Sequence, residues 1–205
     1  DGLPGVIIDR FGDAFVIQPN ASWAENMISE ITDALEQVFA PKIILKNASG
    51  RSRTLEGLDT DTVFIKGNVD APIPVSMNGA TYMADLTGGQ KTGLFFDQRE
   101  NHAFAAKLSK GGTMLDIFSH VGGFSLAALA AGATSALAVD SSQPALDLAI
   151  AGADASGFAK TFDTRKGDAF DTMAALAEEG ATFDVVVCDP PAFAPSKPAL
   201  DRGLR

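Results

Sequence analysis

The stretch "DIFSHVGGFSLAALAAG" (116–132) decides the fold that this sequence predicts. It consists of the end of a strand, a turn at Gly122-Gly123 and an alanine-rich helix. Paired glycines let the backbone come close to a ligand and expose the amides that begin the next helix. The dinucleotide fingerprint G-x-G-x-x-G is absent, which disfavours a bound pyrophosphate. A tight strand–helix turn with no ligand is the alternative interpretation.

On both sides of this stretch, short apolar runs alternate with helical segments. The runs lie at 113–118, 135–140, 161–168 and 183–189. The helices are expected near 123–131, 143–156 and 169–179. Alternation at this spacing is typical of βαβ units on a parallel sheet. Residues 85–205 are therefore predicted to form an α/β domain with a Rossmann-like parallel sheet.

Residues 1–84 have a different rhythm and predict a small α+β domain. Its expected elements are a hairpin at 6–18, a helix at 22–40, strands at 42–47 and 62–67, and a second hairpin at 73–85. Ser22 and Glu25 have the spacing of a capping box at the start of the helix. Asn78-Gly79 is a strong turn dipeptide for the second hairpin.

Acidic residues end, or nearly end, the apolar runs of the α/β domain. Ligands of open parallel sheets bind outside the carboxyl ends of the strands, where Asp140, Asp168 and Asp189 are expected. Asp140 follows the glycine turn by about 20 residues, the place of an acid that accepts from ribose hydroxyls. Asp168 could accept from an adenine amino group, or act as a helix N-cap. Together these features predict a nucleoside pocket without a diphosphate.

The segment "CDPPAF" (188–193) follows the last apolar run. Asp189, Pro190 and Pro191 would hold a carboxylate and rigid carbonyls beside the cofactor, and a flat base could stack on Phe193. The alternative is a strand that ends in a proline turn. Cys188 is interpreted as a buried core residue and not as a nucleophile.

Composition narrows the class of protein. The chain has 205 residues, a net charge of −10, one cysteine and two histidines. These numbers exclude an internal disulfide framework and argue against a metal site, and they fit a reducing cytoplasmic location. No apolar run approaches the roughly 20 residues of a membrane span. The first residue is Asp1 and the sequence stops without a closing element, so we expect a fragment of a longer protein.

The sequence resembles a known family. "GQKTGLFFDQREN", "DIFSHVGGFS", "AVDSS", "GDAF" and "DPPAF" have the order and spacing of class I S-adenosylmethionine-dependent RNA methyltransferases. The chain is similar above all to the large-subunit rRNA cytosine-C5 methyltransferases. The resemblance covers nearly the whole chain, but the family's N-terminal RNA-binding module and its last strands are missing.

The resemblance implies an enzyme that binds S-adenosyl-L-methionine and methylates a base of 23S-type rRNA. The cofactor residues that it implies are Gln98, Arg99, Asp116, Phe118, Gly122, Gly123, Asp140, Ser141, Asp168 and Ala169. The target-base residues are Asp189, Pro190, Pro191 and Phe193. The nucleophilic cysteine would lie beyond Arg205, so this fragment should bind cofactor without turnover. Homodimer formation is a further implication.

Three alternatives stay open. The first is methylation of a base nitrogen, which an acid followed by Pro-Pro and an aromatic residue also suits. The second is a nicotinamide oxidoreductase, which shares the βαβ layout. The third is a non-catalytic cofactor-binding module. RNA contact is expected from a local basic cluster of Lys42, Lys46, Arg51 and Arg53, with Lys91 and Arg99 across the cleft, because the chain has no general basic footprint.

Overall fold

The computed structural model describes residues 2–88 and 93–191. The chain divides into two compact units. The first unit contains residues 1–75 and 84–92, and the second contains residues 76–83 and 93–205. The domain boundary at residue 84 stays a prediction. The contacts divide the second hairpin between the two units, and most of its second strand belongs with the second unit.

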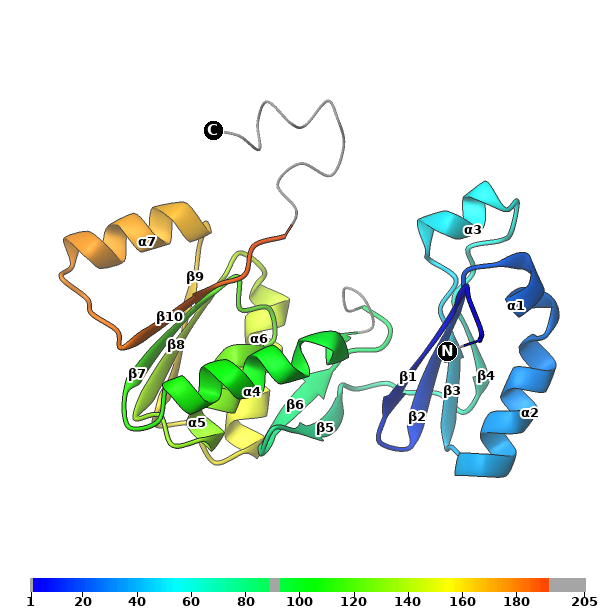
Figure 1. Ribbon diagram of the computed structural model, residues 1–205, viewed down its shortest axis with the longest axis horizontal. Helices are drawn as coiled ribbons and strands as arrows, with labels where there is room; N and C mark the ends of the chain where they lie inside the picture. The colour runs from blue at the N-terminus through cyan, green and yellow to red at the C-terminus, as the bar shows by residue number, and fades with distance from the viewer. Residues whose placement is uncertain (1, 89–92, 192–205) are drawn as a thin grey trace. The chain divides into compact units, whose positions relative to one another are not determined.

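The first unit is a four-stranded mixed sheet with its first two helices on one face and its third helix beyond the ends of the strands (Figure 1). Its elements are β1 (Val6–Phe11), β2 (Ala14–Pro19), α1 (Ser22–Asn26), α2 (Ile28–Phe39), β3 (Ile43–Lys46), α3 (Arg51–Leu55) and β4 (Val63–Lys66). The strand order is β1-β2-β3-β4, and only β2 and β3 are parallel. Phe15, Ile17 and Ile44 face α2 and bury its Leu35. Val16, which points to the opposite face, is also buried, so β2 is covered on both faces.

The predicted helix at 22–40 is two helices, and its capping box does not form. The chain breaks at Met27, where φ is −104° and ψ is 18°. The Ser22 hydroxyl and amide both donate to Glu56 Oε2, at 2.6 and 2.9 Å. Because Ser22 is bonded to a residue 34 positions away, it does not cap the helix, and Ala21 becomes the N-cap.

The basic cluster predicted for RNA contact is largely neutralised within the first unit. Arg53 is fully buried, and its guanidinium pairs with Glu25 at 2.8 Å and with Asp59 at 3.3 Å. Lys46 pairs with the same two carboxylates, and Lys42 pairs with Asp13. Lys91 and the side chain of Arg51 lie outside the described part of the chain. The expectation that Lys46 and Arg53 form an RNA-binding patch is therefore wrong.

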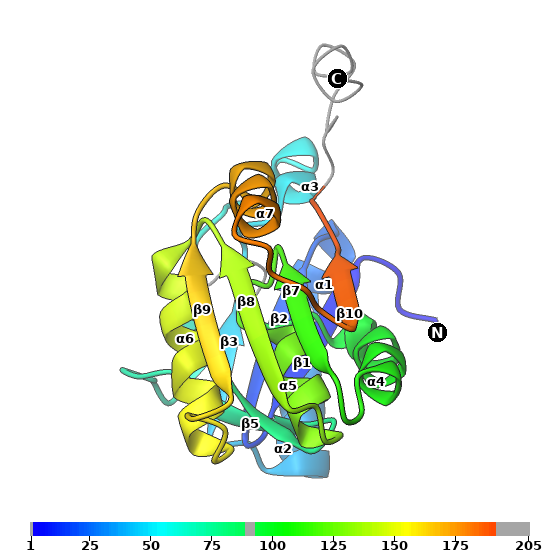
Figure 2. The ribbon, with the colours of Figure 1, turned by 90° about the vertical axis from the view of Figure 1, so that its left-hand side faces the viewer.

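The second unit is a parallel α/β sheet, as predicted. Its elements are η2 (Phe96–Gln98), α4 (Arg99–Leu108), β7 (Thr113–Ile117), α5 (Gly123–Ala130), β8 (Ser135–Asp140), α6 (Gln143–Ala155), β9 (Phe162–Lys166), α7 (Ala169–Glu178) and β10 (Val185–Cys188). The strand order is β10-β7-β8-β9, with every pair parallel. Figure 2 shows α7 on one face and α4, α5 and α6 on the other. The Rossmann-like fold class is confirmed.

The second hairpin consists of β5 (Ile73–Met77) and β6 (Ala80–Ala84). Its turn residues Asn78 and Gly79 have φ values of 51° and 81°. Positive φ at both positions is what a type I′ hairpin requires and explains the Asn-Gly pair. The hairpin at Asn78-Gly79 is thus confirmed.

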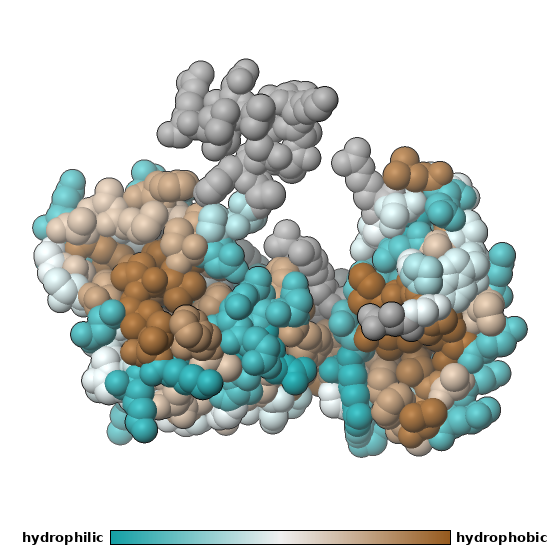
Figure 3. Space-filling view, in the orientation of Figure 1, coloured by the Kyte–Doolittle hydropathy of each residue, from teal (hydrophilic) through white to brown (hydrophobic). Residues whose placement is uncertain are grey.

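The prediction that Cys188 is buried is wrong. On β10, Val185 and Val187 pack against the cluster that contains Met114, whereas Val186 and Cys188 point to the opposite face and are exposed. Figure 3 shows an apolar patch over this part of the sheet, where Val186 is 55% exposed. The reason is that α7 packs on β7, β8 and their neighbours and leaves this face of β10 open.

Candidate functional site

The carboxyl ends of the parallel strands bring the predicted site residues to one edge of the sheet. Register aligns Ile117 of β7 with Val139 of β8 and with Cys188 of β10. The chain then leaves β7 toward Phe118, and β8 ends on Asp140, which is in register with Lys166 of β9. The loops after these strands therefore lie together, at the edge where open parallel sheets bind ligands.

The loop between β7 and α5 has an unusual backbone. Phe118, His120 and Gly122 all have positive φ, at 62°, 50° and 76°. The left-handed region is costly for residues with a side chain, and such residues are concentrated at functional sites. The sequence pattern pointed to Gly122, but it carried no signal for a left-handed backbone at Phe118, since a bulky aromatic residue rarely adopts this conformation; histidine does so more often.

Asp140 fixes this loop through its carboxylate. Oδ2 accepts from the His120 amide at 2.8 Å, and Oδ1 accepts from the Ser142 amide at 2.8 Å. A carboxylate has about four lone-pair sites, so each oxygen keeps acceptor capacity for a ligand. Asp140 is half-buried, and the neighbouring Ser141 is exposed. The side chain is thus oriented before any ligand arrives.

Asp116 is buried beneath the start of α5. Oδ2 accepts from the Ser125 amide at 3.0 Å and from its hydroxyl at 2.9 Å, while Oδ1 has no partner among the described residues. Burial raises the pKa of Asp116 to about 7, with the nearby negative charge of Asp140 adding to it, although the hydrogen bonds from Ser125 oppose the rise. A buried acceptor without a partner is rare in native proteins and marks a place where a ligand could supply a donor.

The two glycines of the turn are required for different reasons. Gly122 adopts the left-handed conformation. At Gly123 an added Cβ would lie 2.7 Å from Cε1 and Nε2 of His102, which belongs to α4. The space that Gly123 leaves is therefore filled by an imidazole from the same unit, so close packing accounts for this glycine as well as any approach of a ligand.

Asp168 acts as the N-cap of α7, as one of its two interpretations predicted. Its Oδ1 accepts from the amides of Phe170 at 2.9 Å and Asp171 at 3.2 Å. Ala169 is buried, so any contact that it makes with a cofactor would come from its backbone. Phe170 is 58% exposed, and its ring meets that of Phe118 edge-on at 6.4 Å. The sequence did not predict a contact between Phe118 and Phe170.

The segment before α4 reaches the same loop. The ring of Phe95 meets that of His120 edge-on at 5.3 Å. Gln98 Oε1 accepts from Asn101 at 2.6 Å, and Arg99, which begins α4, is exposed. Gln98 and Arg99, which were predicted to cover the cofactor, thus lie in a segment that contacts the glycine loop through the Phe95 ring. The Gln98 side chain itself is hydrogen-bonded to Asn101 of α4.

Asp189, Pro190 and Pro191 follow β10 directly, beside the end of β7. Asp189 and Pro191 are exposed. Phe193 lies outside the described residues. Among the side chains that the structure describes, no group of three His, Cys, Asp or Glu residues could hold a metal ion. No described helix has both the length and the hydropathy that a membrane span needs.

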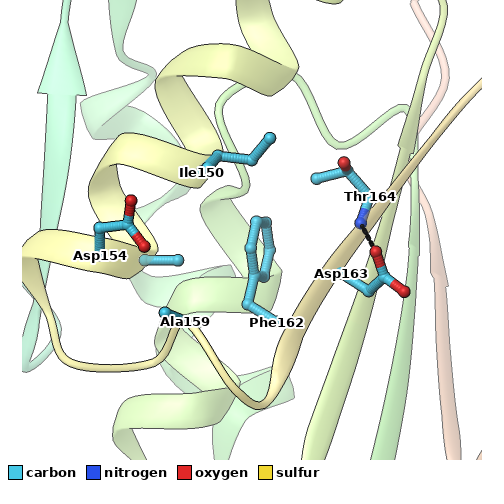
Figure 4. A pocket seen from close by; sticks show the side chains of 7 residues that line it. Ile150, Asp154, Ala159, Phe162, Asp163 and Thr164 are labelled. Carbon is cyan, nitrogen blue, oxygen red and sulfur yellow. Dashed lines mark hydrogen bonds between the residues drawn. The ribbon is translucent and has the colours of Figure 1, made fainter.

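A separate cavity of about 210 Å³ lies between α6 and β9 (Figure 4). It is lined by Ile150, Asp154 and Phe162, among others, with Asp163 accepting from the Thr164 amide at 2.8 Å. Phe162 begins β9, so this cavity lies at the amino end of that strand. It is therefore at the opposite edge of the sheet from Asp140 and is not part of the site.

Comparisons with known proteins agree with this geometry. Residues 35–204 match the model of the S-adenosylmethionine-dependent methyltransferase family. Ribosomal RNA large subunit methyltransferase I of Vibrio vulnificus (strain YJ016) is 37% identical over the whole chain, and the protein of that name from Aeromonas hydrophila is 38% identical over 98% of it. The chain spans about half the length of these relatives, 53% and 51%.

Solved structures show the same fold. A protein assigned as a methyltransferase and solved with S-adenosylhomocysteine superposes with a TM-score of 0.78 at 26% identity. The superposition covers 94% of this chain and 50% of that one. The protein in that crystal structure binds S-adenosylhomocysteine, and its similarity to this chain includes residues of both units.

Proposed function

Since this chain belongs to the S-adenosylmethionine-dependent methyltransferase family, we propose that it is the cofactor-binding part of an enzyme that methylates large-subunit ribosomal RNA. The relatives named ribosomal RNA large subunit methyltransferase I support the substrate class. The observation that carries the proposal is the Asp140 carboxylate, held by two backbone amides at the carboxyl edge of the sheet. A cytoplasmic location and a homodimer belong to the same proposal.

The described residues fit the cofactor. Asp140, with Ser141 beside it, would accept from the ribose hydroxyls, which are uncharged donors that suit a fixed carboxylate. Asp116, whose Oδ1 has no described partner, would accept from the amino group of the methionine part. The loop of Phe118, Gly122 and Gly123 would surround that part of the molecule.

The remaining cofactor residues are assigned in the same way. Asp168 keeps one oxygen outside its two capping bonds and would accept from the adenine amino group, with the Ala169 backbone beside it. Gln98 and Arg99 would cover the pocket, and Arg99 could pair with the cofactor carboxylate. When bound, S-adenosylmethionine supplies an electrophilic methyl group on a sulfonium.

The target base would lie on the side of Asp189, Pro190, Pro191 and Phe193. We assign cytosine C5 as the acceptor atom, which requires a thiolate that adds to C6 and makes C5 nucleophilic. Cys188 is the single cysteine of this sequence. It is exposed and directly precedes Asp189 at the end of β10. The family resemblance, and not the position of Cys188, leads us to place the nucleophile in a segment beyond Arg205.

Calorimetric titration of this chain with S-adenosylhomocysteine and, separately, with NAD tests the cofactor. We expect the first to bind and the second not to bind. Asp140→Ala should weaken S-adenosylhomocysteine binding at least about 100-fold, because it removes a charged acceptor from both the loop and the ribose. Asp147→Ala, which removes an exposed carboxylate from α6, is the matched control and should bind like the wild type. Binding of NAD, or wild-type binding by Asp140→Ala, would contradict the assignment.

The substrate is tested with S-adenosylmethionine that carries a labelled methyl group. The full-length protein should label large-subunit rRNA, and digestion to nucleosides should place the label in 5-methylcytidine. This 205-residue chain, assayed in parallel, should transfer no label. Label in an N-methylated nucleoside would replace cytosine C5 by a base nitrogen as the acceptor. Label transferred by the short chain would move the nucleophile to a residue between Asp1 and Arg205.

A further inference from the structure

The β6 strand is attached to the helices of the second unit through polar contacts. The Thr81 amide donates to Ser156 Oγ at 2.8 Å, next to the end of α6. An added Cβ at Gly152 of α6 would lie 2.9 Å from the Thr81 carbonyl oxygen, which shows how closely strand and helix pack. Asn78, in the hairpin turn, donates to the carbonyl of Arg99 at 3.0 Å. Residues 76–83 of the hairpin are therefore packed and hydrogen-bonded within the second unit.

Tyr82 of β6 reaches the start of α5. Its side chain is fully buried, and its hydroxyl donates to the Gly123 carbonyl at 3.1 Å. Burial, together with the negative charge of Asp116, raises the pKa of Tyr82, so the hydroxyl stays protonated and remains a donor. Tyr82 thus contacts the residue at which the glycine turn becomes a helix.

His102 packs against the same residue. Its ring fills the space where a Cβ of Gly123 would lie, and it meets the Phe124 ring edge-on at 4.5 Å. Burial lowers the pKa of His102 to about 4, against a smaller effect of Asp97, so the imidazole is neutral near pH 7. We call Tyr82, His102 and Gly123 the Gly123 clamp.

From these contacts we infer that Tyr82 is a positioning residue for the cofactor loop: by fixing the Gly123 carbonyl, it holds the turn 118–123 in the conformation that binds S-adenosylmethionine. The inference rests on the proposed function. Without the phenol hydroxyl, the partly buried Gly123 carbonyl loses its described side-chain donor, and the first turn of α5 can shift. Because Ser125 in that turn donates to Asp116, such a shift also reaches the buried carboxylate.

The test compares Tyr82→Phe, which keeps the ring and removes the hydroxyl, with Ser156→Ala, which removes a hydrogen bond to the neighbouring Thr81 that does not involve Gly123. The titrant is S-adenosylhomocysteine. We expect Tyr82→Phe to weaken binding roughly three- to tenfold, in line with the loss of one partly buried hydrogen bond. Ser156→Ala should bind like the wild type, even if both variants lose similar stability.

A spectroscopic signature separates positioning from a general loss of stability. In the cofactor-free protein, the carbonyl ¹³C resonance of Gly123 should move upfield in Tyr82→Phe and stay in place in Ser156→Ala, because only the first variant removes a donor from that oxygen. Equal S-adenosylhomocysteine affinity of Tyr82→Phe and wild type, or an equal loss in Ser156→Ala, would overturn the inference alone. A wild-type chain that does not bind S-adenosylhomocysteine would overturn the proposed function, and the inference with it.

Discussion

Replacing Arg53 by alanine is expected to destabilise the first unit by about 3–5 kcal/mol, the usual cost of removing one partner from a buried ion pair. Arg53 is fully buried and donates to the carbonyls of Pro19 and Asp59 as well as to the carboxylates of Glu25 and Asp59. The substitution removes this donor from the carbonyls of Pro19 and Asp59, although Lys46 still pairs with both carboxylates, and it opens a cavity between the end of β2 and the segment after α3. The free energy of unfolding of a small domain is only about 5–15 kcal/mol, so little of it would remain.

The measurement uses the single tryptophan of the sequence. Trp23 lies in the first unit, where its indole donates to the Pro4 carbonyl at 2.7 Å. Urea unfolding followed by Trp23 fluorescence therefore reports on this unit. Lys42→Ala, which breaks the exposed pair with Asp13, is the control and should leave the urea midpoint unchanged. Arg53→Lys should also be destabilised, since one ammonium cannot replace the guanidinium fork. An Arg53→Ala midpoint equal to that of wild type would show that the buried pair contributes nothing.

The second expected result is a fall in the stability of the second unit as the pH rises from about 4 to about 7. Burial raises the pKa of Asp116 from 3.8 in the unfolded chain to about 7 in the folded one. Between these values the folded state binds more protons than the unfolded state, so the free energy of unfolding decreases with pH and levels off above pH 7. At about 1.4 kcal/mol for each pKa unit, the decrease is at most about 4 kcal/mol.

Asp116→Asn tests this origin, because the amide has nearly the same shape and does not titrate. Urea unfolding at about pH 5 and about pH 8, followed by far-ultraviolet ellipticity with the Trp23 signal identifying the first unit, should show the decrease in wild type and lose it in Asp116→Asn. Asp147→Asn, an exposed carboxylate on α6, should keep the wild-type decrease. If Asp116→Asn keeps it too, another group carries the pH dependence and the Asp116 carboxyl titrates near its ordinary pKa.

The fold of the second unit followed from the sequence because its signals are local. Apolar runs of strand length alternate with alanine-rich segments, and each run ends near an acid. The Asn78-Gly79 turn and the N-cap at Asp168 were likewise predictable, since both depend on one or two neighbouring residues. The glycine turn and the acid about 20 residues later indicated where a nucleoside could bind.

Other features were decided only by contacts between distant segments. Ser22 has a capping-box sequence but bonds to Glu56, and Arg53 has the sequence of a surface cation but is buried against Glu25. The positive φ of Phe118 and the hydrogen bond from Tyr82 to Gly123 carry no local signal. Cys188 is exposed because of which face of β10 it occupies and what α7 leaves open.

The sequence by itself therefore determined the element order of the second unit, its parallel sheet and the candidate cofactor acids, because hydrophobic period and turn chemistry act over a few residues. The tertiary structure decided which charges are paired, that Gly123 leaves space for the His102 ring, and that the Asp116 carboxyl is buried. These outcomes depend on residues such as Glu56, which bonds to Ser22, and Tyr82 and His102, which contact Gly123. All three are distant in sequence from their partners and meet them only after the chain has folded.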